Sequence, residues 1–453
     1  MNFLTKSSQD NYKTIINVEK ENSDLINNLV NMIELDELFE SKKMKDVFNK
    51  FQKLYNQNDD KYIIKTEIIP FNDIKNNLMK YFDKISGLDR NINGTIVGKK
   101  FQELNTIKKI YLLFDNIDLH IELFFIYKEE KINLINQLIK RVCVYINYSK
   151  NTKRMKKIIK LLNNEPFEIY FLMYDVNRQV INRNNNNINE LSNQGTYNCC
   201  SGYNHFVIYP NSKNKEMVIT KIPEMAGLLT HEMGHLLGWD FGLLKNQNGK
   251  HYISLEYLNN EQENELLKLN IEKNQNFYFW ETYENTQTTL IHSISNAIEL
   301  DSSYDTFKQF YKYEILYSIY HAAKILYWHG FNDFNDFFRN GSKIKYYQIA
   351  RLFEYSIVRS FFLLFYNKLF LQDINDDFTL KDQNKITEIN NKIINLMVNN
   401  TPLIYEDIFN IFIEKVKSDK IINMEYFCID LNLDNYYTKY VQYKKKYINQ
   451  RIV

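Results

Sequence analysis

The sequence predicts an α+β protein whose central core combines a mixed sheet with helices. Segments rich in β-branched and aromatic residues, which favour strands, lie in the first half of the chain, for example at 167–174. In the last third, apolar residues recur at helical spacing, for example over 311–328. We therefore expect an N-terminal α/β module (1–165), a core of mixed sheet and helices (166–300) and a mostly helical C-terminal lobe (301–453).

The composition is that of a large globular protein with little net charge. The chain has 453 residues, of which 44% are hydrophobic, and this is enough to build a large core. The 57 basic residues nearly balance the 55 acidic ones, giving a net charge of +2, so no general electrostatic argument favours nucleic-acid binding. The short basic cluster at 153–157 is interpreted as a solvated helix face. The hypothesis of a nucleic-acid-associated factor would rest only on this cluster and on the basic tail at 444–446.

Cysteine usage and hydropathy bear on the compartment. The four cysteines (Cys143, Cys199, Cys200 and Cys428) form neither a C-x-x-C pair nor a disulfide framework, which favours a reducing compartment. The first residues lack the apolar core of a signal peptide. The most apolar stretch, 360–366, is too short to span a bilayer. We therefore expect an intracellular protein without a membrane segment, and the sequence leaves its oligomeric state open.

The N-terminal module alternates helical and strand signals. Apolar residues at helical spacing predict a helix over 25–51. Three segments are typical of strands, and a helix follows the last of them. These strands are predicted at 62–69, 110–114 and 121–127, and the helix at 132–142.

The core begins with sheet. The strand predicted at 167–174 is followed by an asparagine-rich loop at 182–190. Two further strands, 206–209 and 217–219, form a predicted hairpin directly before the most informative segment of the chain. A strand in this place would allow an extended peptide to pair with its edge. Farther along, helices are predicted at 311–328, 349–369 and 386–398, with their aromatic residues mostly in the core.

That informative segment is His231-Glu232-Met233-Gly234-His235. On a helix, residues i and i+4 share one face, so both imidazoles can reach one ion while Glu232 lies beside them. This is the H-E-x-x-H arrangement of zinc hydrolases, in which the glutamate is the general base. In a chain with only 8 histidines, such a pattern arises by chance with odds of roughly one in a hundred. The flanks favour a helix from Pro223 to Leu237, with Gly238 as its stop.

A zinc site of this kind needs a third protein ligand and keeps a fourth position for water. The long metzincin motif requires a histidine at position 241, where this chain has phenylalanine, so that alternative fails. A glutamate-type site requires a later helix, and Glu281 on the segment 279–285 is the preferred candidate. Glu284 on the same segment and Asp240 just after the motif helix are the alternatives. Asn285, four residues after Glu281, could support the site from behind.

A resemblance appears at this point. The motif at 231–235, followed by a helix that contains Glu-Thr-Tyr-Glu-Asn at 281–285, resembles the gluzincin-like zinc metallopeptidases. More narrowly, the order of segments, including Ser-Gly-Tyr at 201–203, is similar to that in a family of predicted metallopeptidases of large DNA viruses. The similarity covers about residues 166–370. It implies a zincin-like catalytic core, and a protein of the host cytoplasm or of the virion. Asn285 stands where that pattern has a second acid.

The sequence therefore predicts a zinc endopeptidase that acts on a polypeptide substrate. His231, His235 and Glu281 would hold Zn²⁺, which lowers the pKa of a bound water to about 7. Glu232 would accept the proton of that water and pass it to the leaving amine.

Further candidates and one alternative remain open. Tyr283 and His321 are candidates for a group that stabilises the oxyanion, as are His292 and Tyr320. The alternative function is a structural or interaction protein, for example a virion component, with a structural or vestigial zinc site. A closed site in which Asp240 acts as a fourth ligand would favour that alternative, because catalytic zinc keeps an open position.

Overall fold

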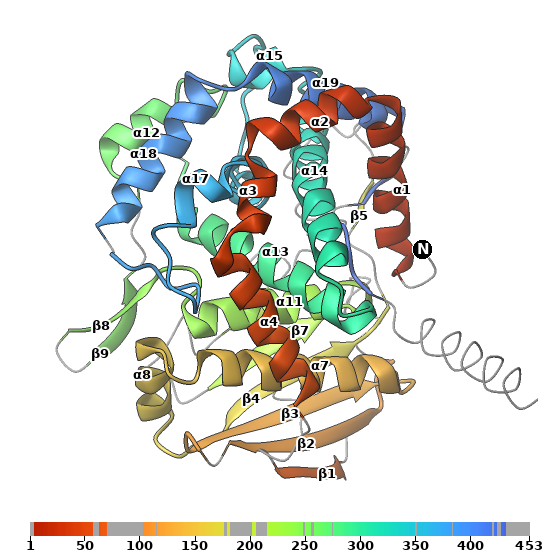
Figure 1. The fold of residues 1–453 in the computed structure, drawn as a ribbon, viewed down its shortest axis with the longest axis vertical. Coiled ribbons are helices and arrows are strands. Elements are labelled where there is room, and N and C mark those ends of the chain that lie inside the picture. The colour runs from red at the N-terminus through yellow and green to blue at the C-terminus, as the bar shows by residue number, and fades with distance from the viewer. Residues whose placement is uncertain are drawn as a thin grey trace, which may run out of the picture.

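The structure is a computed structural model that describes most of the chain. The described residues are 4–57, 63–69, 103–114, 116–175, 179–181, 202–204, 215–247, 250–254, 258–273, 275–348, 351–382, 384–418, 421–423 and 427–431. Within them the protein is α+β, as the sequence predicts. A mixed sheet lies at one end of the molecule and helices form most of the remainder (Figure 1). Two small two-stranded sheets pair β8 (Leu243–Gln247) with β9 (Lys250–Ser254) and β5 (Gln179–Ile181) with β10 (Ile421–Asn423).

The main sheet has six strands in the order β1-β2-β3-β4-β7-β6. They are β1 (Ile63–Ile69), β2 (Thr106–Phe114), β3 (Leu119–Tyr127), β4 (Phe167–Met173), β6 (Gly202–Asn204) and β7 (Glu216–Thr220). The first three pair antiparallel, β3–β4 and β4–β7 are parallel, and β6 pairs antiparallel with β7. In the register, Ile121 lies opposite Phe167, and Glu168 lies opposite Glu216. Parallel neighbours need a long crossover, and two helices between β3 and β4 provide it.

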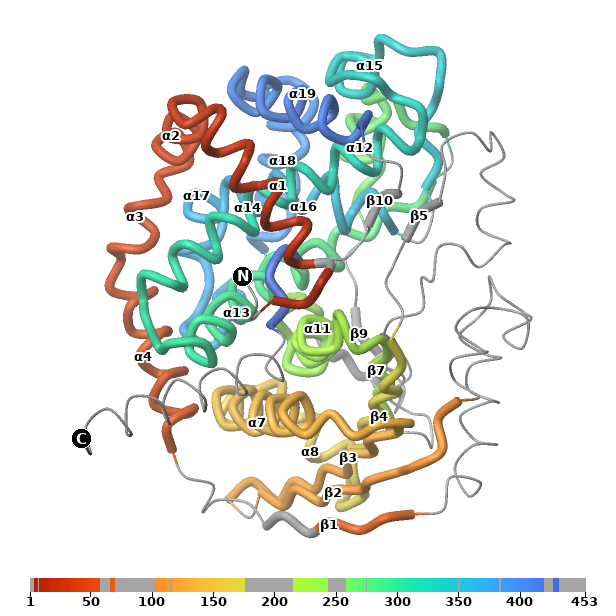
Figure 2. Tube along the Cα trace, turned by 90° about the vertical axis from the view of Figure 1, so that its right-hand side faces the viewer, coloured from red at the N-terminus to blue at the C-terminus, as the bar shows by residue number. Residues whose placement is uncertain are grey.

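The helices form layers above this sheet (Figure 2). In chain order they are α1 (Lys6–Glu21), α2 (Ser23–Met32), α3 (Leu35–Glu40), α4 (Lys42–Asn56), α7 (Ile132–Ser149), α8 (Lys153–Leu162), α11 (Met225–Leu237), α12 (Asn260–Leu266), α13 (Phe279–Leu300), α14 (Tyr304–Trp328), α15 (Phe334–Phe338), α16 (Arg359–Leu364), α17 (Tyr366–Phe370), α18 (Lys385–Val398) and α19 (Leu403–Ser418). α11 packs against α7, α13, β6 and β7, so it is enclosed between the sheet layer and the helical bulk.

The sheet is continuous across the predicted boundary between residues 165 and 166, because β3 pairs directly with β4. The N-terminal helices also pack on distant parts of the chain. α1 contacts α14, α2 contacts α19, and α4 contacts both α7 and α13. One hydrophobic core therefore contains side chains from all three predicted regions.

Two predicted helices are interrupted in the structure. The segment 25–51 becomes α2, α3 and α4, because Glu34 takes a left-handed conformation (φ 55°) and the Ser41 side chain caps α4. The segment 349–369 becomes a π-helical stretch η3 (Phe353–Val358) followed by α16 and α17. The predicted loop at 182–190 and the predicted strand at 206–209 lie outside the described residues.

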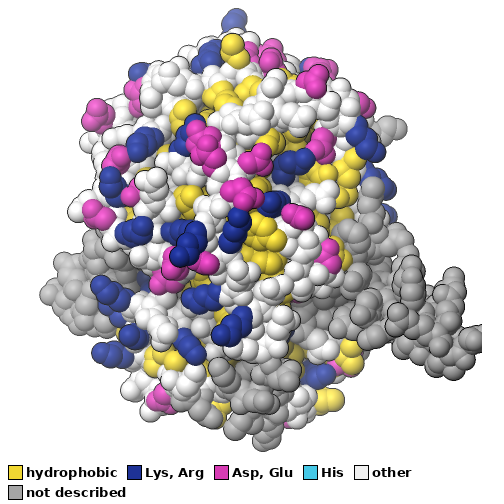
Figure 3. Space-filling model, viewed as in Figure 1, with side chains coloured by type: hydrophobic (Ala, Val, Ile, Leu, Met, Phe, Trp, Pro, Cys, Tyr) yellow, Lys and Arg dark blue, Asp and Glu magenta, His cyan; other side chains and the backbone are white. Residues whose placement is uncertain are grey.

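Charged side chains of both signs are mixed over most of the face in Figure 3, and basic ones are more frequent at its lower left. This distribution agrees with the small net charge of the chain. No helix in the described ranges combines the length and apolar character that crossing a bilayer requires.

Candidate metal centre

Local sequence signals define both ends of the helix that carries the motif. A short 3-10 turn, η2 (Ile222–Glu224), contains Pro223 and leads into α11. At the other end, Gly238 is left-handed (φ 83°) and its N–H bonds back to the carbonyl of Gly234. The predicted helix from Pro223 to Leu237 with a glycine stop is therefore confirmed. Every residue of α11 is buried.

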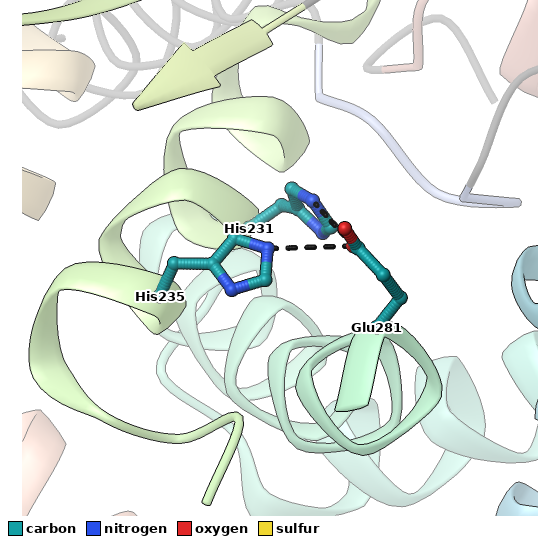
Figure 4. A group of neighbouring side chains, drawn as sticks. All are labelled: His231, His235 and Glu281. Carbon is teal, nitrogen blue, oxygen red and sulfur yellow. Dashed lines mark ion pairs between the residues drawn. The ribbon is translucent and has the colours of Figure 1, made fainter. Parts of the chain in front are cut away.

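Three side chains from two helices converge at one point (Figure 4). The Nε2 atoms of His231 and His235 lie 3.8 Å and 3.4 Å from the same oxygen, Oε2 of Glu281 on α13. One ligand atom from each of the three residues lies within 4.8 Å of the others, and all three residues are buried. The group can therefore hold a metal ion.

This donor set fits a zinc ion. With Zn–N and Zn–O bonds near 2.0–2.1 Å, the ligand atoms of a tetrahedral site lie about 3.3 Å apart, close to the two distances found here. Two imidazoles and one carboxylate can hold zinc or another first-row divalent ion. The arrangement is thus compatible with a bound metal ion.

Carboxylates stand behind both imidazoles. Oε2 of Glu284 contacts Nδ1 of His231, and Oδ2 of Asp240 lies 3.1 Å from Nδ1 of His235. Such contacts fix the orientation of a metal-binding imidazole and leave its Nε2 directed at the ion. The structure therefore places Glu284 and Asp240, the two alternative ligands, as supports for the histidines. Asn285 instead donates to the carbonyl of Glu281 within α13.

Asp240 is itself held from two sides. Its Oδ1 accepts a hydrogen bond from the Gly242 N–H at 2.9 Å. Burial alone would raise the pKa of Asp240, but the contact with His235 and the charge of Arg154 hold the pKa below its ordinary value. The carboxylate is therefore kept ionised, which suits a group that supports a metal-binding imidazole.

Arg154 corrects the interpretation of the basic cluster at 153–157 as a solvated face. It is buried and donates to the carbonyls of His235 (3.1 Å), Leu236 (3.4 Å) and Gly242 (3.4 Å). A cation bound to the last carbonyls of a helix also complements the negative end of the helix dipole. Arg154 thus stabilises the end of α11 at which His235 lies, and no spacing in the sequence indicates this contact.

The glycine inside the motif allows α11 and α13 to approach closely. A Cβ atom at Gly234 would overlap Oε1 of Glu284 and would lie 2.7 Å from Cγ2 of Thr288. The contact between Glu284 and His231 therefore depends on the missing side chain at position 234.

Gly234→Ala is expected to lower the free energy of unfolding by about 1–3 kcal/mol, since the added methyl group overpacks this contact. It should also weaken zinc binding by about 10- to 100-fold, because Glu284 is displaced from His231. Denaturant unfolding and zinc titration against a competing chelator measure the two effects. Met233→Leu, a volume-conserving change of the neighbouring buried residue, is the control. Wild-type zinc affinity in Gly234→Ala would contradict the support assigned to Glu284.

Glu232 lies beside the donors on α11 and is buried. Burial raises its pKa and the nearby Glu284 adds to the rise, whereas His231, His235 and Arg351 act in the opposite direction. The net shift is upward. A carboxylate with a raised pKa is a better proton acceptor, which is the property required of a general base.

Two residues that sequence reasoning did not identify contact the third donor. The Tyr355 hydroxyl donates to Oε2 of Glu281 at 2.9 Å, and Arg351 pairs with Oε1 of the same carboxylate. Tyr355 lies in the π-helical stretch η3, and Arg351 is left-handed (φ 60°). Both features are uncommon and occur often at functional sites. Because the sequence predicts one regular helix over 349–369, it offers no signal that would single out either residue.

The predicted oxyanion candidates lie elsewhere. The Tyr283 hydroxyl donates to Oδ1 of Asn390, and its ring packs on Phe362 and Phe370, away from the donors. His321 stacks on Tyr317 within α14, and its Nδ1 lies 3.3 Å from the Ser356 hydroxyl.

The other two candidates, His292 and Tyr320, also have structural surroundings. His292 contacts Arg141 and the carbonyl of Ile429, and Tyr320 packs on Phe412. The structure thus brings His231, Glu232, His235 and Glu281 together and leaves Tyr283, His321, His292 and Tyr320 outside this group.

A buried arginine holds α11 against α13 from behind. Arg141 on α7 forms two 2.8 Å hydrogen bonds with the carboxylate of Glu299 and one of 2.6 Å with Asn296, both on α13. The same guanidinium donates to the carbonyl of Ala226 on α11 at 3.1 Å. Charge-assisted hydrogen bonds thus link Arg141 to both helices that carry the metal donors, and they hold α11 against α13.

No protein-family model, curated protein or solved structure matches this chain.

Proposed function

We propose that this protein is a zinc-dependent metallopeptidase. The observation that carries the proposal is the convergence of His231, His235 and Glu281 on one point, with Glu232 beside them on the same helix. The carboxylates behind both imidazoles support the proposal, because they contact the Nδ1 atoms and so leave each Nε2 atom free to bind a metal. The resemblance of residues 166–370 to gluzincin-like metallopeptidases leads to the same proposal, and the mixed sheet with α11 would then be a zincin-like core.

Zinc held by these residues would supply a water of lowered pKa, about 7, and would polarise a peptide carbonyl. Glu232 would accept the proton of the attacking water and deliver it to the leaving amine nitrogen. Its position on α11, one residue after His231, keeps it at the edge of the donor set. Its buried surroundings raise its pKa and so improve it as a base.

Tyr355 takes the role that the sequence offered to Tyr283 and His321. Its hydroxyl reaches the same Glu281 oxygen on which the two imidazoles converge, so it stands at the rim of the reacting centre. A hydroxyl donor in that place can stabilise negative charge on the carbonyl oxygen as water adds.

A structural zinc site remains the second candidate, and the deep burial of His231, His235 and Glu281 is the observation that favours it. A structural site normally has four protein ligands. In the described part of the chain, Asp240 stands behind His235 instead of completing such a set. The position of Asp240 therefore supports the catalytic alternative.

Metal removal tests the proposal. Peptides from a digested proteome would be incubated with zinc-loaded, chelator-treated and zinc-restored protein, and new termini would be identified by mass spectrometry. We expect cleavage by the loaded protein, its loss after chelation and its recovery with zinc. A protein that retains about one zinc per chain and cleaves no peptide would reject the peptidase and favour the structural site.

A further inference from the structure

We propose that Arg351 forms a subsite for a carboxylate next to the scissile bond, so that the enzyme prefers substrates with a carboxylate there. This inference rests on the proposed peptidase function. The carboxylate can be an acidic side chain or the free C-terminus of a peptide. The evidence comes from the position of Arg351, from the groups that hold it and from the hydrogen-bonding capacity that it keeps.

The Glu281 carboxylate lies between Arg351 and the two histidines of the metal site. Arg351 pairs with Oε1 of Glu281, while Oε2 is the oxygen that faces His231 and His235. Consecutive residues of an extended peptide are about 3.3–3.6 Å apart. A carbonyl placed at the ion therefore brings a neighbouring residue of the substrate within reach of the guanidinium.

The guanidinium is held in place by aromatic rings. Its Cζ atom lies 4.8 Å from the ring centre of Tyr278 and 5.1 Å from that of Trp280. Trp280 in turn packs on His235, with ring centres 5.0 Å apart. The backbone of Arg351 is left-handed (φ 60°), a conformation that is uncommon for a residue with a side chain. An arginine fixed in this way is preorganised for recognition.

Hydrogen-bonding capacity remains at this point. Glu281 is the only ion-pair partner of Arg351 among the residues that the structure describes, and 38% of the arginine side chain is exposed. A guanidinium offers several N–H donors in a planar fork that matches a carboxylate. The N–H donors of Arg351 that do not face Glu281 are therefore available to a substrate carboxylate.

A second carboxylate near Arg351 is held by other donors. Glu354 is close enough to Arg351 to feel its charge, and it accepts hydrogen bonds from the Tyr278 N–H and from Gln348. The guanidinium therefore keeps its remaining N–H donors for a further acceptor.

The experiment compares matched peptides after the cleavage sites have been found by digestion of a peptide library. One pair differs only by glutamate or glutamine next to the scissile bond, and a second pair only by a free or amidated C-terminus. We expect wild-type kcat/KM to be about 10- to 100-fold higher for the carboxylate member of one pair, as for hydrogen bonds between charged groups. The pair that responds identifies the source of the carboxylate.

Three variants and one control separate recognition from positioning. Arg351→Gln and Arg351→Lys should each reduce the preference, and lysine should restore less than the full ratio because it lacks the planar fork. Tyr355→Phe also removes a contact with Glu281, and we expect it to lower both rates while keeping their ratio. Arg339→Gln, at an exposed arginine directly after α15, should change neither rate nor ratio.

The outcomes are distinguishable from failure of the proposed function. If wild type cleaves no peptide, the peptidase itself is rejected. If it cleaves without preference for either carboxylate, or if the preference survives in Arg351→Gln, the subsite is rejected and the peptidase stands. Zinc content is measured for each variant. If Arg351→Gln loses zinc, the test is the ratio of kcat/KM for the two matched peptides in zinc-bound Arg351→Lys. A wild-type ratio in Arg351→Lys would overturn the proposal.

Discussion

Replacing Glu232 with glutamine is expected to lower kcat by about 10²- to 10⁴-fold while zinc stays bound, because the amide keeps the shape of the side chain and cannot accept the proton of water. The surroundings of Glu232 make the change specific. The residue is not among the three convergent donors, and burial raises its pKa above the ordinary value. Rates on a library-derived peptide and zinc content by mass spectrometry are the two measurements.

The control for this change is Glu261→Gln, an exposed glutamate on α12, which packs against α18. It should keep wild-type rate and zinc content. If Glu232→Gln retained wild-type activity, Glu232 would not be the base, and the assignment of the motif helix to hydrolysis would fail even with zinc present.

The second large effect concerns stability. Arg141→Met is expected to lower the free energy of unfolding by about 3–5 kcal/mol, the usual cost of leaving one charge of a buried pair without its partner. Arg141 is fully buried, and the Glu299 carboxylate that it binds is nearly so. The variant would also remove the donor that links the Ala226 carbonyl on α11 to α13. Urea unfolding followed by far-UV circular dichroism measures the change.

The double variant Arg141→Met with Glu299→Met is the companion measurement. It removes both charges, so it should recover part of the lost stability relative to Arg141→Met alone. A loss below about 1 kcal/mol in the single variant would show that this network does not hold α11 against α13.

Local signals in the sequence predict the elements that lie close to the site. The run of β-branched and aromatic residues at 167–174 gives β4, and Pro223 and Gly238 define the ends of the motif helix. These features depend on neighbours along the chain. The breaks at Glu34 and at Phe365 are instead attributed to tertiary packing that overrides helical spacing, so one helix is predicted where the structure has several elements.

The metal site shows the same division between features set by the local sequence and features set by tertiary packing. The spacing of His231, Glu232 and His235 places them on one helix without further information. Glu281 and Glu284 are three residues apart on α13, so both face the same side, and only the packing of α13 on α11 decides which carboxylate meets Nε2 and which meets Nδ1. Arg154 and Tyr355 reach the site from distant segments through contacts that no local pattern encodes.

Zinc content is the most direct test of the central claim that His231, His235 and Glu281 hold one metal ion. The measurement is inductively coupled plasma mass spectrometry on wild type, His235→Ala, Glu281→Ala and Glu284→Ala, all purified without added metal and then dialysed against a zinc-buffered solution. We predict about one zinc per chain in wild type, loss in His235→Ala and Glu281→Ala, and weakened but detectable binding in Glu284→Ala, whose carboxylate supports His231 from behind. No zinc in wild type, or full retention in Glu281→Ala, would contradict the account.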